Sequence, residues 1–270
     1  MVRKYGKHAA KADPRRVMLS TYMSALLPAP PATCDRTYGI TDWTPMGNSG
    51  EDEPPPGVRV CGDCAYAAPG HLVMAWSMAT AKKPVIIPAT DIVAAYAAGT
   101  GYNPITGAGD DGSSMPSVCE QWRTAGIGGN KITAYGALST QNQLGIMQAV
   151  YLFGGAYIGL NLPASAEQQT DANLVWTVPW FSPIIGGHAV PILSYDATHV
   201  WLITWGKIQC ATWQFILKYM DEAFACINPL WIAADGLAPD SGLNTTALVI
   251  DLNLVASKPG PPPSAGARAA

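Results

Sequence analysis

The chain has 270 residues, of which 49% are hydrophobic and only 13% are charged. This length suits one large domain or two small lobes that share a core, and this composition excludes general disorder. The formal net charge of -3 excludes an overall basic field for nucleic acid. The longest nearly unbroken apolar run, residues 149–160, is too short to span a bilayer. We therefore expect a folded protein whose partner is neither nucleic acid nor a membrane.

The first sixteen residues hold an excess of positive charge. Six of the sixteen cations lie there against a single anion, Asp13, so residues 17–270 carry ten cations and eighteen anions, a net charge of -8. We favour a solvated basic arm, and the alternative is an electrostatic clasp that lies on the acidic body. No apolar segment of the signal-peptide kind follows these residues, so we expect no secretory signal peptide.

The chain contains six cysteines. Without an export signal we expect mostly reduced thiols, and a Cys61–Cys119 disulfide is the alternative if the protein acts outside a cell. Cys61 and Cys64 also form a C-x-x-C pair. A thioredoxin-like redox pair needs a βαβ context that residues 40–60 do not provide. A zinc site would need further ligands from Cys34, His71 or Cys119.

Predicted helices come first along the chain, and predicted strands follow. Apolar spacing predicts helices over residues 64–81, 91–99, 115–124 and from Thr140 to about Leu152. Runs of β-branched and aromatic residues predict strands over 156–162, 188–195, 199–204 and 246–255, with one more helical stretch over 214–226. Segregated helices and strands favour an α+β fold in two lobes over alternating βαβ units.

We divide the chain into an arm with its following segment (residues 1–33), a domain (34–255) and a disordered tail (256–270). Within the domain we expect a helical lobe over about 61–153 and a β lobe over about 154–255. Local signals place the helix ends: Pro69 near a first turn, Thr90 as an N-cap, and a capping box between Thr140 and Gln143.

Two short stretches carry residues with catalytic chemistry. Cys64 begins a predicted helix, where exposed N–H groups and the helix dipole favour a thiolate. A thiolate that attacks a substrate also needs a proton partner, and His188 supplies one at the start of a predicted strand. Gly186 and Gly187, directly before it, leave room for another chain to approach the imidazole. Taken singly, the cysteine is more simply an inert buried thiol and the histidine a hydrogen-bonded core residue.

Together these stretches resemble the papain-like cysteine peptidases. That family has a Cys-Gly-x-Cys nucleophile segment at a helix start, which residues 61–64 match, and later a Gly-His-Ala-Val strand, which residues 187–190 match. Its Asn-Ser-Trp-Gly segment looks like residues 203–206 here, and its upstream Asn-Gln-Gly looks like residues 48–50. The resemblance covers about residues 34–255. Phrases such as GDCAYAAPGHL and TWGKIQCATWQF are of the type found in divergent members from actinobacteria and their phages.

The resemblance implies a role for each matching residue. Cys64 would be the nucleophile, and His188 would be the general base and later the general acid. The backbone N–H of Cys64 and the side chain of Asn48 would form the oxyanion hole. Trp205 would cover the back of the imidazole.

The resemblance also points to a substrate cleft. Asp111 and Gly112 correspond to the glycine-rich segment that lines it, although a plain loop turn is the simpler interpretation of these two residues. Gly187 would leave room for substrate beside the histidine. Trp180, with Trp176 and Phe181, would form an apolar wall. The long loop over about 163–185 that carries these aromatics is a candidate lid.

The chain departs from the family pattern near the nucleophile. Asp63 stands where the family often has a small residue, and an adjacent carboxylate opposes thiolate formation. Ala65 replaces the usual aromatic. The insertion EDEPPPGVRV lies between Asn48 and Cys64, so the oxyanion assignment depends on how this insertion folds.

The asparagine that orients the histidine in the family is replaced here. Counting back from Trp205, Ile203 holds its position and Thr204 holds that of the serine. A threonine hydroxyl can accept a hydrogen bond from an imidazole Nδ1–H, and isoleucine cannot. Because neighbouring strand residues face opposite sides, only one of the two faces His188. We predict that it is Thr204.

The sequence supports two hypotheses from different classes. The first is a papain-like thiol hydrolase, a peptidase or amidase that cleaves peptide or isopeptide bonds of a peptide or protein substrate through an acyl-enzyme on Cys64, without a cofactor or metal. The arm would then be a propeptide-like segment. The second is a catalytically weak or inactive papain-like fold that serves as a structural or binding module, such as a phage virion component; the lost asparagine favours it. We expect a cytoplasmic or virion-associated protein.

Overall fold

The structure is a computed structural model that describes residues 3–11, 18–19, 28–44, 59–231, 238 and 241. Asn48, the predicted strand over 246–255 and the tail over 256–270 lie outside the described residues. Six α-helices lie in the described part of the chain. They are α1 (Cys64–Ala81), α2 (Ala89–Thr100), α3 (Met115–Thr124), α4 (Gln143–Phe153), α5 (Ala164–Asp171) and α6 (Trp213–Tyr219).

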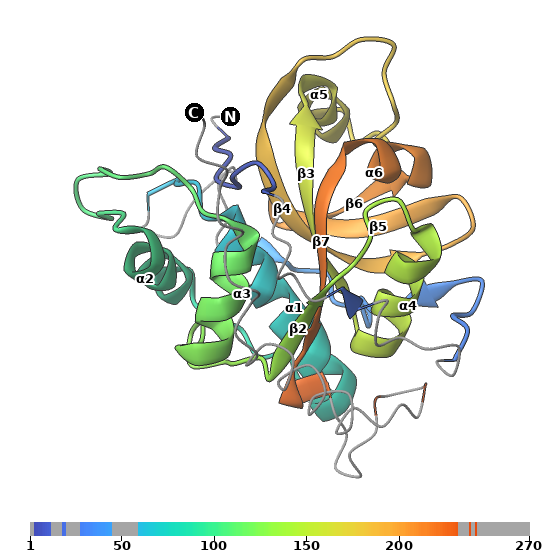
Figure 1. Ribbon diagram of the computed structural model, residues 1–270, viewed down its shortest axis with the longest axis horizontal. Helices are drawn as coiled ribbons and strands as arrows, with labels where there is room; N and C mark the ends of the chain where they lie inside the picture. Colours follow the sequence, from blue (N-terminus) through green and yellow to red (C-terminus); the bar gives the residue numbers. More distant parts are fainter. Residues whose placement is uncertain are drawn as a thin grey trace, which may run out of the picture.

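The strands form one seven-stranded antiparallel sheet in the order β2-β7-β3-β4-β5-β6, with β1 paired to β4. Figure 1 shows α1, α2 and α3 together on one side of the sheet. The predicted α+β fold is therefore confirmed. Of the helices in the described segments, none is long and apolar enough to cross a membrane. The strands are β1 (Cys34–Asp35), β2 (Ala134–Ala137), β3 (Ala156–Pro163), β4 (Ile184–Tyr195), β5 (His199–Thr204), β6 (Lys207–Thr212) and β7 (Met220–Ile227).

The sheet is covered on both faces, and its strand residues alternate between two apolar cores. Ala189 and Ile203 pack with α1, α2 and α3, whereas their neighbours Val190 and Leu202 pack with α4 and α6. This alternation follows from the period of two along a strand. Helix α4, which we expected in a helical lobe, packs instead on the second face of the sheet.

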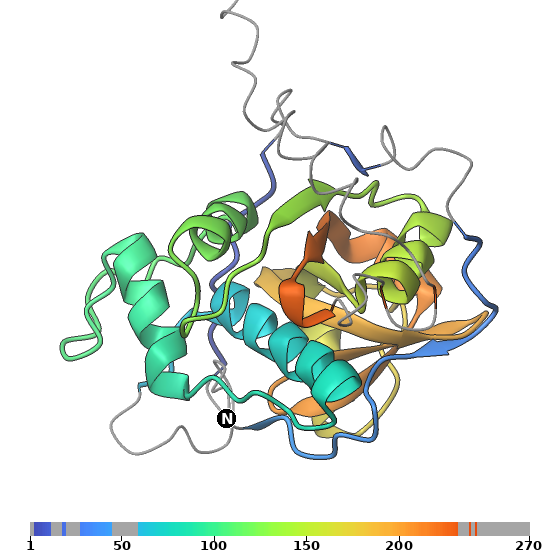
Figure 2. The same cartoon turned by 90° about the horizontal axis from the view of Figure 1, so that it is seen from below.

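Helix α1 lies at the centre of the molecule, between the sheet and the other two helices of its side (Figure 2). Every residue from Cys64 to Ser77 is buried. Such all-round burial suits a helix whose sequence is apolar on every face. The helix spans Cys64–Ala81, as the sequence predicts.

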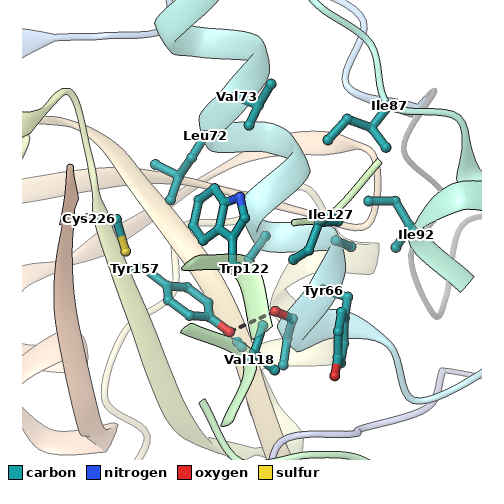
Figure 3. Packing of buried hydrophobic residues seen from close by; sticks show 14 of the residues in the cluster. Tyr66, Leu72, Val73, Ile87, Ile92, Val118, Trp122, Ile127, Tyr157 and Cys226 are labelled. Carbon is teal, nitrogen blue, oxygen red and sulfur yellow. Dashed lines mark hydrogen bonds between the residues drawn. The ribbon is translucent and has the colours of Figure 1, made fainter. Parts of the chain in front are cut away.

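Pro69 lies inside α1 and not in its first turn. Proline has no N–H, so the carbonyl four residues earlier, that of Ala65, loses its helical donor. The buried hydroxyl of Tyr157 on β3 donates to this carbonyl at 2.7 Å. Figure 3 shows this hydrogen bond as the dashed line from Tyr157, within the core that α1 forms with its neighbours. The sheet thus supplies the donor that the helix lacks.

Two predicted helix starts were wrong by a few residues. Pro88, not Thr90, precedes α2, because its carbonyl already accepts hydrogen bonds from the N–H groups of Asp91 and Ile92. Asn142, not Thr140, caps α4 through a hydrogen bond from the N–H of Gly145. Thr90 is the second residue of α2 and Thr140 lies two residues before the α4 cap, so neither stands at the capping position.

Two longer predictions were also wrong. The helix predicted over 214–226 ends at Tyr219, and Met220–Ile227 is the strand β7. Pairing with both β2 and β3 overrides the helical spacing of this segment. The region 163–185, expected as one long loop, contains α5 and a β-bridge between Trp176 and Ala211.

Candidate active site

Cys64 is the first residue of α1, and its side chain is fully buried. Burial raises the pKa of its thiol to about 11. Hydrogen bonds from the backbone N–H groups of Ala189 and Gly6 act in the opposite direction, and the carboxylate of Asp63 adds to the rise. The thiol is therefore protonated at neutral pH in this structure. The hydrogen bond from Ala189 also places Cys64 beside β4.

His188 lies on β4 with its ring fully buried. Its Nε2 is 2.7 Å from the hydroxyl oxygen of Thr204. The indole of Trp205 stacks on the imidazole, with ring centroids 5.1 Å apart and planes 17° from parallel. The other ring nitrogen, Nδ1, is buried and has no hydrogen-bond partner among the described residues. The ring is thus held on two sides, with Nδ1 available to a neighbouring group.

Electrostatics keep the imidazole neutral in this state. Burial and, to a smaller extent, the positive charge of Arg3 lower the pKa of His188 to about 3. The protonated thiol differs from the thiolate that we expected at this helix start. The pair is in its uncharged form because both groups are shut off from water.

Thr204 lies against His188, and Ile203 faces the opposite side of β5, in the core of α1. The structure thus places the hydroxyl where the sequence analysis expects the orienting group. The contact involves Nε2 and not Nδ1, which corrects the nitrogen that we assigned. Trp205 follows with φ of 46°, a left-handed turn residue that lays its indole on the ring.

Asp110 links the segment before Cys64 to helix α2. Its Oδ1 accepts hydrogen bonds from the N–H of Gly62 at 2.7 Å and from the hydroxyl of Tyr96 at 2.9 Å. The Tyr96 oxygen in turn accepts from the N–H of Gly112. Burial raises the pKa of Asp110, but hydrogen bonds from Lys4, Gly62 and Tyr96 outweigh it and leave the pKa below its ordinary value.

The N-terminal arm, residues 3–11, runs through this site. In both overall views its dark blue trace lies between the helices and the sheet (Figures 1 and 2). Ser113 donates to the carbonyl of Gly6 at 2.6 Å and accepts from the N–H of His8 at 2.9 Å. On the other side, the N–H of Lys7 donates to the carbonyl of Gly187 at 3.0 Å. The arm is therefore an extended strand bound to both walls of a cleft.

The side chains of the arm bind charged and aromatic groups of the body. Three ion pairs anchor it: Arg3 with Asp171 at 2.6 Å, Lys4 with Asp110 at 2.6 Å, and Lys7 with Asp221 at 2.8 Å. The guanidinium of Arg3 also lies 4.1 Å from the ring centroid of Trp205. The solvated arm that we favoured is therefore wrong for residues 3–7, which the clasp describes, whereas residues 8–11 are exposed.

Arm residues cover both members of the cysteine–histidine pair. Tyr5 meets His188 edge-on, with ring centroids 5.9 Å apart, and its hydroxyl donates to Glu167. Gly6 presents its N–H to the thiol of Cys64. The arm therefore covers the thiol that a substrate carbonyl would have to reach.

Solved cysteine proteases share this fold. Xylellain, a cysteine protease from Xylella fastidiosa, superposes with a TM-score of 0.60 at 14% identity, over 84% of this chain and 96% of that chain. The proCathepsin B S9 from Trypanosoma congolense gives a TM-score of 0.58 at 10% identity, over 84% of this chain and 86% of that chain. The chain has a papain-like fold. No protein-family model and no curated protein sequence matches it.

Within this papain-like fold, the predicted cleft residues fall into two groups. Gly112 touches the arm, because a Cβ there would lie 2.1 Å from the carbonyl oxygen of Gly6. Asp111 is exposed but accepts a contact from His8 Nε2 at its carbonyl, and Gly187 binds the arm through its own carbonyl. Trp180 is wrong as a cleft wall, because its side chain is fully exposed.

The other two aromatics of the predicted wall also lie elsewhere. Phe181 is 82% exposed, whereas Trp176 is fully buried under Trp205 and Phe215. A hydrogen bond from the Trp176 indole N–H to Thr170 fixes this burial. The cleft is bounded instead by backbone groups of Ser113 and Gly187.

The remaining candidates for a reactive or metal-binding role are His71, Cys61 and Cys119. His71 is buried in α1 and its Nε2 contacts the carbonyl of Trp43 at 3.0 Å. All six cysteines are free thiols, so Cys61 and Cys119 are not bridged. The described segments contain no group of three or more His, Cys, Asp or Glu that could hold a metal ion.

Tyr5 and Asp221 shape this site without being among the predicted residues. The charge of the arm signals that its cations seek anions, but not which ones. Asp221 gives no local signal, because it reaches the cleft only through the pairing of β7 with β3.

Proposed function

We propose that this protein is a papain-like thiol hydrolase, a peptidase or amidase, with Cys64 as nucleophile and His188 as general base. One observation carries the proposal. His188 is held through Nε2 by Thr204 and stacked by Trp205, and its buried Nδ1, which has no partner among the described residues, is the nitrogen that we assign to the thiol of Cys64. The papain-like fold supports the reaction class.

In the proposed reaction the arm has left the cleft. Nε2–H donates to the Thr204 oxygen, so Nδ1 is the basic nitrogen and takes the proton of the thiol. The sulfur attacks the amide carbonyl carbon, and the carbonyl oxygen becomes an oxyanion near the backbone N–H of Cys64, which has no acceptor within the helix. Asn48 remains our proposal for the second donor.

The second half of the reaction returns the enzyme to its starting state. The tetrahedral intermediate breaks its C–N bond, and His188 gives its proton to the leaving amine. Water then attacks the thioester carbonyl while His188 accepts a proton from it. The acid product leaves, and the sulfur recovers its proton from the imidazolium. No cofactor enters any of these steps.

The test uses the full chain with the single change Gly6→Ala. Because a Cβ at Gly6 would lie 1.5 Å from the carbonyl oxygen of Gly62, this change prevents the arm from seating; we call this variant the arm-released chain. It is treated at a pH of about 5.5, well below the free-thiol pKa, with iodoacetamide and with a biotinylated epoxysuccinyl amide. Peptide mapping then measures labelling of all six cysteines.

We expect Cys64 to label at least about tenfold faster than Cys210 or Cys226, because an imidazolium partner maintains the thiolate. His188→Ala should remove this advantage, and the matched control His199→Ala should retain it. Hydrolysis of fluorescein-labelled casein is measured in parallel. If Cys64 labels no faster than the other cysteines, the hydrolase proposal fails, and the papain-like fold serves as a binding or structural module.

A further inference from the structure

The arm carries a buried cation one residue after Gly6. The side chain of Lys7 is 0% exposed, and its Nζ lies 2.8 Å from Oδ2 of Asp221. The same Nζ donates to the carbonyl of His8 at 2.8 Å. Asp221 comes from β7, and its side chain is only 15% exposed. Burial removes the water that hydrates both charges, so protein groups must take its place around this ion pair.

The space that the Lys7 side chain occupies, which we call the seat, is shaped for a long side chain. A Cβ on Gly159 of β3 would lie 2.0 Å from Cε of Lys7 and 2.7 Å from the sulfur of Met115. The glycine therefore leaves the space that the aliphatic stem fills. Met115 and the β3 backbone line the stem, and the Asp221 carboxylate meets the charge at its end.

Backbone groups decide which residue enters the seat. Ser113 and Gly187 bind Gly6, Lys7 and His8 through main-chain atoms alone. Such contacts do not depend on side-chain type, so any extended chain that uses them places one side chain in the same seat. Lys7 directly follows Gly6, whose N–H reaches the thiol of Cys64. The seat thus lies close to the bond that the thiol would attack.

We propose that Asp221 makes this seat a specificity subsite for a lysine or arginine side chain, so that the substrates are basic peptides or proteins. This inference rests on the proposed function of the same site. When the arm leaves, Asp221 loses its cation, and a basic substrate restores the pair. Oδ1 of Asp221 is also buried without a hydrogen-bond partner among the described residues. A forked guanidinium can use both oxygens.

The experiment measures the preference directly in the full chain carrying Gly6→Ala and Lys7→Ala, so that the tethered lysine cannot compete. The probes are biotinylated tripeptidyl acyloxymethyl ketones in which only one side chain varies, among Lys, Arg, norleucine and Glu. The varied side chain is placed at the first or the second residue from the reactive ketone. Labelling rates of Cys64 are then compared as ratios between probes.

At one of the two positions we expect Lys and Arg probes to label Cys64 at least about tenfold faster than norleucine, with Glu slowest, because a buried charge pair is lost without the cation. Asp221→Asn should bring the Lys-to-norleucine ratio close to one, and Asp221→Arg should favour Glu. The matched control Glu120→Gln, a surface carboxylate on α3, should leave the ratio unchanged.

Failure of the subsite and failure of the proposed function give different results. If all probes label Cys64 at similar rates in the parent chain, the subsite is wrong while the nucleophile stands; this comparison needs no Asp221 variant to fold. If Asp221→Asn keeps the lysine preference, Asp221 serves only to anchor the arm, and the inference is overturned. If neither the probes nor iodoacetamide label Cys64 faster than the other cysteines, the proposed function fails and the subsite fails with it.

Discussion

A Cβ atom on Gly6 would lie 1.5 Å from the carbonyl oxygen of Gly62, so these two glycines meet backbone to backbone. Gly6 belongs to the arm, and Gly62 lies two residues before Cys64. The N–H of Gly62 in turn donates a hydrogen bond to Asp110 at 2.7 Å, which holds Gly62 in place against the arm. The docking of the arm therefore depends on the absence of a side chain at residue 6.

Gly6→Ala should release the arm and expose the thiol. We expect the rate of Cys64 alkylation by iodoacetamide at neutral pH to rise by about tenfold or more, because the wild-type thiol is fully buried. Peptide mapping by mass spectrometry measures the rate. Ala9→Ser, a change at an exposed position of the same arm, serves as the control. Equal rates in wild type and Gly6→Ala would show that the arm does not protect Cys64.

The pH profile of labelling should change with the arm. In the docked state burial raises the pKa of Cys64 to about 11 and lowers that of His188 to about 3. Between these values the thiol is protonated and the imidazole is neutral, so wild-type labelling should increase with pH. In Gly6→Ala, water reaches the pair and an ion pair can form. Its labelling should then be largely independent of pH above about 5; a climb parallel to that of wild type would contradict this expectation.

The hydroxyl of Thr204 should matter more than its methyl group. In the arm-released chain, Thr204→Val removes the partner of His188 Nε2 while keeping the shape, so we expect hydrolysis or probe labelling to fall by about tenfold to a hundredfold. Thr204→Ser keeps the hydroxyl and should retain most of the rate. The pH profile supplies a second measurement, because a misplaced imidazole should also lose the thiolate at pH 5–6. If the valine variant matches the serine variant, the hydroxyl does not position the ring.

His71 should make the fold sensitive to acid. Burial lowers the pKa of this histidine to about 4, below its ordinary value of 6.5. Between pH 6.5 and 4 the unfolded chain binds a proton here and the folded chain does not, so stability falls as the pH drops. The full loss below pH 4 is about 3 kcal/mol. His71→Gln should reduce the slope of the unfolding free energy against pH, measured by urea unfolding between pH 4.5 and 6.5. The reduction should correspond to at most one bound proton. His199→Ala, a change near the surface, should leave it as in wild type.

Local chemistry explains which parts of the site the sequence predicts. Cys64 is recognisable because a helix of mostly apolar residues begins there. Strand β5 has its predicted bounds because β-branched residues fill it between two turns. Thr204 follows from strand alternation once Ile203 is placed in the core. These inferences need only neighbours along the chain.

Other parts depend on contacts between distant segments. Asp221 lies in a stretch whose spacing predicts a helix, and only the pairing of β7 with β3 turns its carboxylate toward Lys7. The charge of the arm favours a solvated arm over a clasp when the sequence is considered alone, because the partners Asp110, Asp171 and Asp221 are separated by long stretches of sequence. Trp180 is apolar like a wall residue, yet it is fully exposed. Composition alone does not distinguish these outcomes.

The hydrogen bond from Tyr157 to the Ala65 carbonyl should stabilise the helix that carries Cys64. Tyr157→Phe leaves this buried carbonyl without a donor, because Pro69 has no N–H, and we expect it to cost about 1–3 kcal/mol of unfolding free energy. In a Pro69→Ala background the new N–H can donate to Ala65 along the helix, so the same change should cost less by about 1 kcal/mol. Urea unfolding of the two single variants and the double variant measures this coupling. Tyr135→Phe, at a tyrosine that also packs against Phe224, is the matched control. Costs that simply add would show that the proline does not create the need for the hydroxyl.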